Sequence, residues 1–465
     1  MRRPPFPVAL VAAWAAVLAV GCGRADPPPS IVILSVDTLR RAALRAYDPA
    51  AVALPAFDDF AAESVRFDHA FTTASWTLPS HASLLTGLYP DRHGATHFRV
   101  TLSQEVTTLA EALGRAGYQT VGLTDGGFLT WTFGFDRGFE RYDARVAGEG
   151  PGVSLPREGR PTGVPGSALF DRAIALLESR PADAPPLFLF LQTFSVHDYF
   201  NLRPWARKRV PESEKFPDER IFELCLSGQT SCEASTWKLL EDLYDAELTH
   251  LDAGFARLRD ALEAAGLWES SVVFLVSDHG EGFDPDRGRI HHGGRLHADL
   301  IQIPFLVRMP GGEPRIRDEL VSLVDVMPTV LALANAPAEP GLDGRSLAPL
   351  LTGEGEVGPP APILAMEHMY GWQDSQRVRT PEPPKRSLSI AVIDRDGWYL
   401  RARRSEEFYD WRSDPRQERD LAGEADLEAY RRQVRSRPGV PVETEPMHYD
   451  AELRDQLRAL GYSVD

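Results

Sequence analysis

Cysteine is scarce in this chain of 465 residues, which contains only three. None of them stands in a C-x-x-C spacing, which argues against a zinc–thiolate site. Cys225 and Cys232 lie close together in CLSGQTSC. In an oxidising compartment such a pair predicts a local disulfide across a surface loop, and the alternative is two free thiols.

Positive charge is scarce as well. Fifty Lys and Arg residues stand against 67 Asp and Glu residues, a formal net charge of −17. This balance argues against nucleic acid as a partner. It does not exclude an anionic ester as substrate, because the local charge of a metal site outweighs the global balance. The apolar share of 43% and charged share of 25% are ordinary for a globular protein.

Long hydrophobic runs are absent after the N-terminus, where the chain begins with an expected export signal. Arg2 and Arg3 precede the uncharged apolar run Val8–Val20, which is shorter than the roughly 20 residues that span a bilayer. The run ends in LAVGC, which resembles a bacterial lipoprotein cleavage site. Cys22 would then be the lipidated first residue of the mature protein. The alternative is a plain signal peptide in which Cys22 is incidental.

The domain organisation follows from these shifts in composition. We expect a protein exported as a periplasmic or outer-membrane-anchored lipoprotein, or otherwise secreted. The predicted segments are a signal peptide at 1–22, a tether at 23–30, a large domain at 31–336 and a smaller C-terminal subdomain at 337–465.

Continuous apolar runs predict strands that are buried on both faces of a sheet. They occur at Ile31–Val36, Phe188–Leu191 and Val272–Val276. Helical patterns lie between and beside them, at 107–116, 167–178 and 235–265. This alternation predicts an α/β sandwich with a mostly parallel central sheet. Short strand-like pieces at 388–393 and 398–401 and a final helix at 451–460 predict an α+β C-terminal subdomain.

Two aspartates follow predicted strands directly. Asp37 follows the first strand, and Asp278 follows VVFLVS and precedes His279. Ligands gather at the carboxyl ends of strands in open α/β sheets, and two carboxylates with one imidazole suit a divalent cation. Taken alone, Asp37 could instead be the N-cap of a helix in TLRRAALRAY, and Asp278 a turn residue before Gly280.

A threonine stands near the start of a predicted helix. Pro79 is well placed as the first helical residue and Gly87 as the C-terminal stop. Thr77 would then lie just ahead of a helix N-terminus, which favours an anion. A hydroxyl there, in contact with a cation, can be deprotonated and attack phosphorus or sulfur. The alternative is that Thr77 is a helix cap.

These segments together resemble a known family. TLPSHASLLTGLYPDRHG resembles the sulfatase signature, and IVILSVDTLR and VVFLVSDHGEGF resemble the two metal-binding strands of sulfatases. LFLFLQTFSVHDYF, HHGGRLHADLIQIPFLV and LVDVMPTVLALANAP have counterparts in the same order. The resemblance covers nearly everything from Ile31 to Asp465. It implies an alkaline-phosphatase-like sandwich in which residues 31–336 form the catalytic domain.

The resemblance implies a metal site at specific positions. Asp37, Asp278 and His279 match the metal ligands, and the oxygen of Thr77 completes the set. Many members have two adjacent aspartates on the first strand, whereas here Thr38 follows Asp37. We therefore expect one divalent metal ion, with Mn²⁺, Zn²⁺ or Mg²⁺ preferred over Ca²⁺.

The resemblance also implies roles for histidines. His197 matches a histidine that contacts the bound anion or the leaving group. His292 is the better match for a general acid or anion contact near the leaving oxygen, with His291 as the alternative. A protonated imidazole could donate to the leaving group near neutral pH. His81, which we count with the catalytic residues, replaces the arginine of the sulfatase motif.

Two departures from the sulfatase pattern bear on the chemistry. Sulfatases oxidise a Cys or Ser to an aldehyde, whereas the same oxidation of Thr77 would give a poorly hydrated methyl ketone. Thr77 is therefore expected to act as an ordinary alkoxide. The lysines that clamp the anion in sulfatases are also missing. All four lysines of the chain lie outside every motif: Lys208, Lys215, Lys238 and Lys385.

The predicted reaction is a ping-pong displacement on an anionic ester of a small molecule, glycan or lipid. Thr77 attacks, and water or an acceptor alcohol resolves the adduct. Phosphoesters or phosphodiesters are the first choice of substrate, and a sulfuric ester hydrolase without formylglycine is the alternative. A third alternative is a non-catalytic binding lipoprotein of the same fold. The membrane would be a partner only through the lipid anchor.

Overall fold

The structure of the protein is a computed structural model. It describes residues 27–98, 100–144, 165–197, 199, 234–284, 289–353, 355, 357–358, 361–368, 388–402, 405–437 and 454. The signal peptide with Cys22 lies outside these residues, as do Cys225 and Cys232, so lipidation and the disulfide stay predictions. Of the expected final helix, only Arg454 is described.

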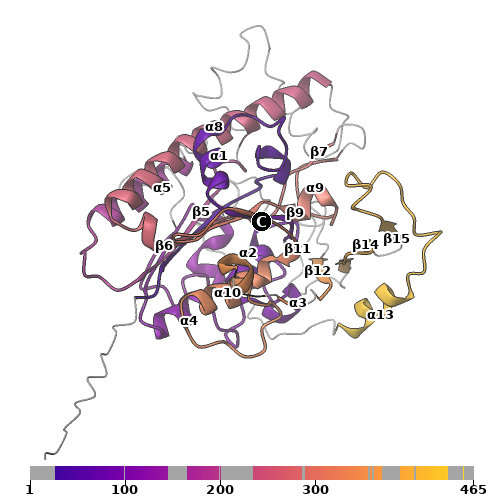
Figure 1. Cartoon of the computed structure of the whole chain (residues 1–465). Coiled ribbons are helices and arrows are strands. Elements are labelled where there is room, and N and C mark those ends of the chain that lie inside the picture. Colours follow the sequence, from indigo (N-terminus) through magenta and orange to yellow (C-terminus); the bar gives the residue numbers. More distant parts are fainter. Residues whose placement is uncertain are drawn as a thin grey trace, which may run out of the picture.

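A large central sheet is the framework of the molecule (Figure 1). Within the described residues it has nine strands, in the order β11-β2-β10-β6-β1-β5-β3-β4, with β9 pairing beside β2. The strands are β1 (Ser30–Val36), β2 (Val65–Phe71), β3 (Gln119–Thr124), β4 (Arg141–Ala144), β5 (Leu187–Thr193), β6 (Ser271–Ser277), β9 (Gln302–Ile303), β10 (Phe305–Arg308) and β11 (Arg315–Ser322). The neighbouring strands β6, β1, β5, β3 and β4 pair parallel to one another. β10 pairs antiparallel with both β6 and β2, and β9 pairs antiparallel with β2. The predicted α/β sandwich with a mostly parallel sheet is confirmed.

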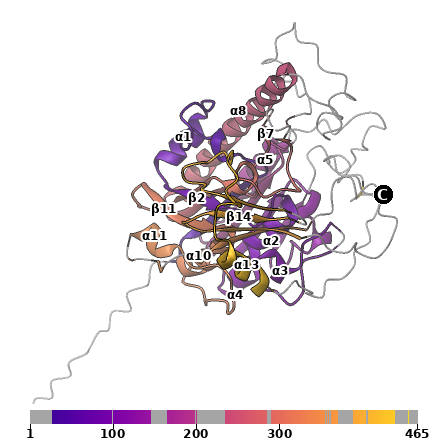
Figure 2. The same ribbon diagram turned by 90° about the vertical axis from the view of Figure 1, so that its right-hand side faces the viewer.

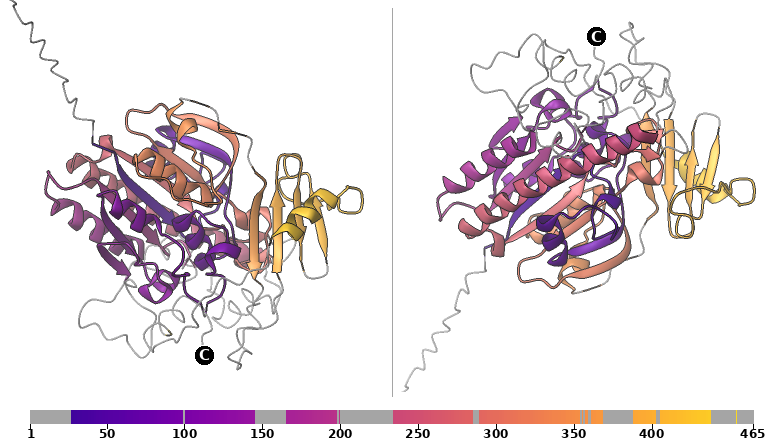
Figure 3. Two further views of the ribbon diagram at one scale, coloured as in Figure 1. Left: turned by 90° about the horizontal axis from the view of Figure 1, so that it is seen from below. Right: turned by 90° about the horizontal axis from the view of Figure 1, so that it is seen from above.

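Helices cover both faces of this sheet (Figures 1 and 3). One face carries α1 (Pro55–Ala62), α5 (Pro165–Glu178) and α8 (Ala234–Ala264). The other carries α2 (Thr77–Thr86), α3 (Pro90–His93), α4 (Leu109–Arg115), α10 (Val326–Leu333) and α11 (Ala348–Thr352). The short helix α9 (Ala298–Ile301) precedes β9, and 3-10 turns lie at Arg41–Ala43, Gly127–Leu129, Trp131–Phe133, Trp268–Ser270 and Leu323–Asp325.

The side chains of β1 explain why the sheet needs both layers. Ile31 and Ile33 pack in the core beneath α2, whereas Val32, Leu34 and Val36 pack in the core beneath α8. Side chains of a strand alternate between faces, so a continuous apolar run has to be covered twice. The uninterrupted runs in the sequence thus predict a sheet with buried faces, as found.

Helix α2 differs by two residues from its prediction. It begins at Thr77 rather than at Pro79, which places Pro79 third in the helix. This position costs no internal hydrogen bond, because first-turn N–H groups have no partner within a helix. The predicted stop at Gly87 is confirmed, since Gly87 ends the helix in the left-handed region with a φ of 67°. Thr77 is therefore the first helical residue and not the residue ahead of it.

A smaller sheet packs against one end of the large domain (Figures 2 and 3). It contains β12 (Ile363–His368), β13 (Leu388–Ile393), β14 (Trp398–Arg401) and β15 (Glu406–Tyr409), in that order and antiparallel. One face packs on the large domain around Phe71 and Leu300, and the other packs against α13 (Glu428–Ser436). The expected α+β C-terminal subdomain is present, but its described helix, α13, is not the segment 451–460 for which the sequence predicts a helix.

The junction between the two parts lies after α11 in this structure. Leu347, Leu350 and Leu351 belong to the core of the large domain, and the small sheet starts only at β12. We therefore propose a boundary between residues 353 and 363, later than the position 337 expected from composition. Among the described residues, no helix combines the length and the apolar character needed to cross a membrane.

Candidate active site

Four predicted residues meet at the carboxyl edge of the central sheet. The Thr77 hydroxyl donates to Asp37 Oδ2 at 3.2 Å. His279 Nε2 lies 3.8 Å from Asp37 Oδ1 and 3.3 Å from Asp278 Oδ2. All four side chains are fully buried. The separate motifs of the sequence therefore form one cluster in space.

Strand pairing explains why the two aspartates meet. β1 and β6 are parallel neighbours, and Val36 pairs with Ser277. The next residue on each strand is Asp37 or Asp278, so both carboxylates emerge side by side. Helix α2 then brings Thr77 to them from the loop that follows β2.

The turn after β1 is shaped to hold Asp278. Thr38 has a left-handed backbone with a φ of 56°, which is uncommon for a β-branched residue. Its N–H donates to Asp278 Oδ1 at 3.3 Å, and the His279 N–H donates to the same oxygen at 2.9 Å. The Thr38 hydroxyl donates to the Asp37 carbonyl instead of entering the cluster. Thr38 thus supplies a backbone contact to the cluster and no side-chain ligand.

The simpler interpretations of Asp37 and Thr77 are wrong. TLRRAALRAY forms turns and a short 3-10 segment at Arg41–Ala43, and the cap position there is Arg40, so Asp37 caps no helix. Trp76 is the N-cap of α2, and no side-chain capping bond is made there. Both side chains are instead directed at each other.

Burial controls the charge of the cluster. It raises the pKa of Asp37 well above its ordinary range, and the neighbouring Asp278 adds to this. Burial likewise raises the pKa of Asp278 to about 7. Burial and the adjacent His292 lower the pKa of His279 well below its ordinary value. Two carboxylates this close and this buried need a compensating positive charge to be ionised together.

The donor set fits a divalent cation. Asp37 Oδ1, Asp278 Oδ2 and His279 Nε2 are buried and have no hydrogen-bond partner in the structure. These atoms all lie within 4.8 Å of one another. Buried polar atoms without partners are costly, and two carboxylate oxygens with an imidazole nitrogen are suitable ligands for Mn²⁺, Zn²⁺ or Mg²⁺.

His81 lies behind the cluster, on the inner face of α2. Its Nδ1 donates to the Thr77 carbonyl at 3.0 Å, and its Nε2 accepts from the Ser35 hydroxyl at 2.9 Å. Burial lowers its pKa to about 4, so the ring is neutral near pH 7. In these contacts His81 connects the start of α2 to β1, whereas the arginine that it replaces would bring a positive charge.

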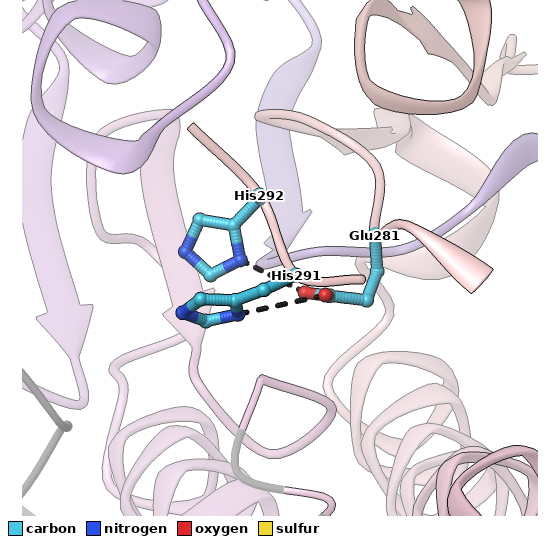
Figure 4. Close-up of side chains that lie close together, drawn as sticks. All are labelled: Glu281, His291 and His292. Atoms are coloured by element: carbon cyan, nitrogen blue, oxygen red, sulfur yellow. Dashed lines mark hydrogen bonds and ion pairs between the residues drawn. The ribbon is translucent and has the colours of Figure 1, made fainter. Parts of the chain in front are cut away.

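The predicted histidine pair, His291 and His292, lies against the carboxylate of Glu281 (Figure 4). His292 Nδ1 donates to Glu281 Oε2 at 2.8 Å, and His291 Nδ1 lies 3.5 Å from Glu281 Oε1. The rings of His292 and His279 have centroids 4.6 Å apart. Burial and the adjacent His291 lower the pKa of His292 to about 3. This favours a neutral ring, whereas the sequence predicts a protonated one.

His197 completes this group of imidazoles. It is buried, and its ring centroid lies 5.0 Å from that of His292 and 6.2 Å from that of His291. The segment just after β5 carries it to the same edge of the sheet. The structure therefore brings all of the predicted catalytic histidines to one region, although their individual roles stay predictions.

Two polar residues at the site escape the sequence reasoning. Glu281 follows the Asp278 and His279 pair in the quoted motif and is fully buried. Gln192 lies near the end of β5, and its side-chain amide lies 3.5 Å from Asp37 Oδ2. The signal for both was position, because polar residues at or just beyond the carboxyl end of a buried strand reach this edge.

No lysine among the described residues reaches the site. Lys238 on α8 is the one described lysine, and its side chain is 66% exposed beside Asp242. Arg295, an arginine from the quoted HHGGRLHADLIQIPFLV motif, forms a two-pronged ion pair with Asp299. The described part of the site is therefore rich in carboxylates and imidazoles and poor in fixed positive charge.

Comparison with known proteins adds the family. A sequence model of the sulfatase family matches residues 29–336. Arylsulfatase A of Homo sapiens is 29% identical over 388 residues, which cover 75% of this chain and 72% of the human protein. The phosphonate monoester hydrolase of Agrobacterium radiobacter superposes with a TM-score of 0.69 at 19% identity, covering 88% of this chain and 94% of that one. A 2-O GAG sulfatase superposes with a TM-score of 0.70 at 18% identity, covering 88% and 90%.

The structural likenesses show the fold, and the family match covers more than half of the chain and includes every residue of the cluster. This chain therefore belongs to the sulfatase family and is an ester hydrolase with the alkaline-phosphatase-like fold.

Proposed function

We propose that this protein hydrolyses phosphoesters or phosphodiesters, or transfers their phosphoryl group, with Thr77 as nucleophile. The observation that carries the proposal is the position of the Thr77 hydroxyl. It lies at the first residue of α2, buried, 3.2 Å from Asp37 Oδ2. A hydroxyl held there is near both a carboxylate and the positive end of a helix dipole.

Asp37, Asp278, His279 and Thr77 would hold the cation, in keeping with a family that generally depends on metal. When bound, a divalent cation supplies the positive charge that favours the alkoxide of Thr77 and offsets charge on the ester. Mn²⁺, Zn²⁺ or Mg²⁺ are our preferred ions, because Thr38 provides no carboxylate for a calcium cage.

The residues of the chain supply the remaining parts of a two-step displacement. Asp37 accepts the hydrogen bond of the Thr77 hydroxyl and so offers its proton an acceptor. The Thr77 oxygen bonds to phosphorus as the bond to the ester oxygen breaks, and the departing alcohol takes up a proton. His197 is the imidazole proposed to deliver it, because the neutral His292 donates its one N–H to Glu281. Water then cleaves the phosphothreonine, or an acceptor alcohol does so in a transfer reaction.

The side chain of Thr77 is the reason for preferring phosphorus. Formylglycine chemistry needs an aldehyde hydrate, and a threonine cannot provide it. The solved structure of a phosphonate monoester hydrolase shares the fold, which supports the capacity of this scaffold for phosphorus esters. Sulfuric ester hydrolysis is the second candidate, favoured by the 29% identity to arylsulfatase A.

One panel of substrates separates these candidates. Purified protein loaded with Mn²⁺, Zn²⁺, Mg²⁺ or Ca²⁺ would be assayed on p-nitrophenyl phosphate, bis-p-nitrophenyl phosphate and p-nitrophenyl sulfate. We expect turnover of a phosphorus ester, lowered at least about 10³-fold in Thr77→Ala and partly retained in Thr77→Ser. Mass spectrometry of the active-site peptide should show unmodified threonine.

Two outcomes would contradict this proposal. Turnover of the sulfate alone, abolished by Thr77→Ala, would establish the sulfuric ester alternative. Full activity of Thr77→Ala on every substrate would show that Thr77 is not the nucleophile.

We also propose that the substrate is an anionic ester on a small molecule, glycan or lipid, and that a lipid on Cys22 places the enzyme at a membrane surface.

A further inference from the structure

Glu281, His291 and His292 form a second group of potential metal ligands beside the first. One ligand atom from each residue lies within 4.8 Å of the others. Both histidine rings turn their Nδ1 atoms toward the two oxygens of the same carboxylate (Figure 4). The three residues come from the segments that flank the small hairpin of β7 (Phe283–Asp284) and β8 (Arg289–Ile290). No part of the proposed cation shell uses them.

One oxygen of the Glu281 carboxylate makes only a long contact to His291. The Glu281 side chain is fully buried, and Oε1 has no hydrogen-bond partner in the structure, although His291 Nδ1 lies 3.5 Å away. His292 Nε2 is likewise buried without a hydrogen-bond partner. Buried ionisable groups with open coordination positions are typical of metal sites.

The backbone that carries the histidines is held in an uncommon conformation. His291 has a φ of 67°, in the left-handed region that non-glycine residues rarely adopt. The N–H of Gly293 donates to the Ser75 carbonyl at 2.9 Å, which ties the loop to the segment before Thr77. Strain of this kind persists where the surroundings fix a functional geometry.

The formal charge of the site favours a second cation at this group. Asp37, Asp278 and Glu281 bring three carboxylates to the site, so one divalent cation leaves a formal charge of minus one. An anionic ester is repelled by such a site, and no lysine among the described residues corrects the deficit. A second divalent cation makes the formal charge plus one, which attracts the substrate.

We propose that Glu281, His291 and His292 bind a second divalent cation, adjacent to the cation of Asp37, Asp278 and His279. One carboxylate and two imidazoles suit Zn²⁺ or Mn²⁺. The role of this cation in substrate binding rests on the proposed function, but its presence does not. With His292 as a ligand, the contact to the leaving group falls to His197.

Metal content tests this directly, without substrate. The full chain would be stripped with chelator, equilibrated with buffered Zn²⁺ or Mn²⁺, and measured by inductively coupled plasma mass spectrometry. We expect two equivalents of bound metal per chain in the wild type. In Glu281→Gln we expect one, because the affinity for the second ion should fall at least about tenfold. His69→Asn is the matched control, because His69 forms a similar pair with Asp318 at 2.8 Å outside the site. It should retain both equivalents.

Electron paramagnetic resonance of the Mn²⁺-loaded protein tests whether the two ions are neighbours. Spin coupling is expected in the wild type and a single-ion spectrum in Glu281→Gln. One equivalent in the wild type would overturn the proposal whether or not the variant folds. Two equivalents in Glu281→Gln, or two uncoupled Mn²⁺ ions in the wild type, would also overturn it. None of these results depends on Thr77, so the two proposals fail independently.

Discussion

At the scale of single residues, burial assigns each histidine of the site its environment. His81 and His292 are both buried, but they contact different partners. His81 Nδ1 donates to the Thr77 carbonyl at 3.0 Å and lies 3.5 Å from Asp278 Oδ2, whereas His292 Nδ1 donates to the Glu281 carboxylate at 2.8 Å. Burial lowers the pKa of His81 to about 4, so its ring stays neutral near pH 7 despite the nearby Asp278 carboxylate. His81 is therefore suited to positioning the nucleophile, and not to holding an anion.

Replacing His81 should mainly destabilise the protein. His81→Ala removes the partners of Ser35 and the Thr77 carbonyl and leaves a cavity, so we expect a loss on the order of 3 kcal/mol in the free energy of unfolding. His69→Ala, at a half-buried pair with the exposed Asp318, should cost less than about 1 kcal/mol. Urea denaturation measures both. Normal stability of His81→Ala with weakened anion binding would instead place His81 in contact with the substrate.

At the scale of elements, the turn after β6 depends on close backbone packing. A Cβ atom on Gly280 would lie 2.1 Å from the backbone oxygen of Asp299. The N–H of Gly280 also donates to the Leu300 carbonyl at 2.7 Å. This glycine lets the segment that carries Asp278 and His279 lie against the start of α9, which fixes the direction of the metal ligands.

Gly280→Ala should therefore be strongly destabilising. The backbone atoms that it meets cannot rotate away, and we expect a loss of about 3 kcal/mol in the free energy of unfolding. Gly117→Ala is the control, because its φ of 86° is strained but nothing lies within 4 Å of the added Cβ; it should cost about 1 kcal/mol. Equal losses in urea denaturation would show that the contact with Asp299 is unimportant.

The strand β12 joins the small sheet to the loop before the nucleophile. The Met366 N–H donates to the Thr73 carbonyl at 2.8 Å, and the Ser75 hydroxyl donates to Glu367 Oε2 at 2.5 Å. Burial raises the pKa of Glu367 from 4.5 to about 7, although the Ser75 hydrogen bond opposes this. The C-terminal subdomain thus contacts the segment that positions Thr77.

This shift predicts a pH dependence of stability. Because the folded-state pKa of Glu367 is raised, its protonated form is favoured by folding. The contribution of protonated Glu367 to the free energy of unfolding is complete below pH about 4.5. It is lost as the pH rises through about 7, at roughly 1.4 kcal/mol per pH unit within that window. The difference between wild type and Glu367→Gln in the free energy of unfolding should follow this slope. Parallel curves for the two proteins would contradict the buried, protonated carboxyl.

At the scale of the whole molecule, the predicted lipid anchor can be tested separately from the enzyme activity. If Cys22 is lipidated, the full chain should fractionate with membranes and incorporate labelled fatty acid in a bacterial host. Cys22→Ser should abolish labelling and release the protein to the soluble fraction, with catalytic activity unchanged because position 22 lies outside residues 29–336, which match the sulfatase family. Equal membrane association of both proteins would contradict the lipid anchor.

The sequence by itself determined the layers of the fold and the residues of the first candidate cation site. Uninterrupted apolar runs require a sheet covered on both faces, and polar residues directly after such strands must lie at its carboxyl edge. Asp37 and Asp278 are therefore predictable, and the family resemblance adds Thr77 and His279. The start of α2 was less predictable, because a proline is tolerated anywhere in a first helical turn.

Only the tertiary structure decided the environment of each group. Parallel pairing of β1 and β6 placed two carboxylates side by side, and burial then raised their pKa values. Packing also showed that His81 lies between the Thr77 carbonyl and Asp278, and that Glu281 meets His291 and His292 across a hairpin. Such facts depend on distances between residues remote in sequence, which the order of amino acids does not state. The second candidate cation site could therefore be recognised only from the tertiary structure.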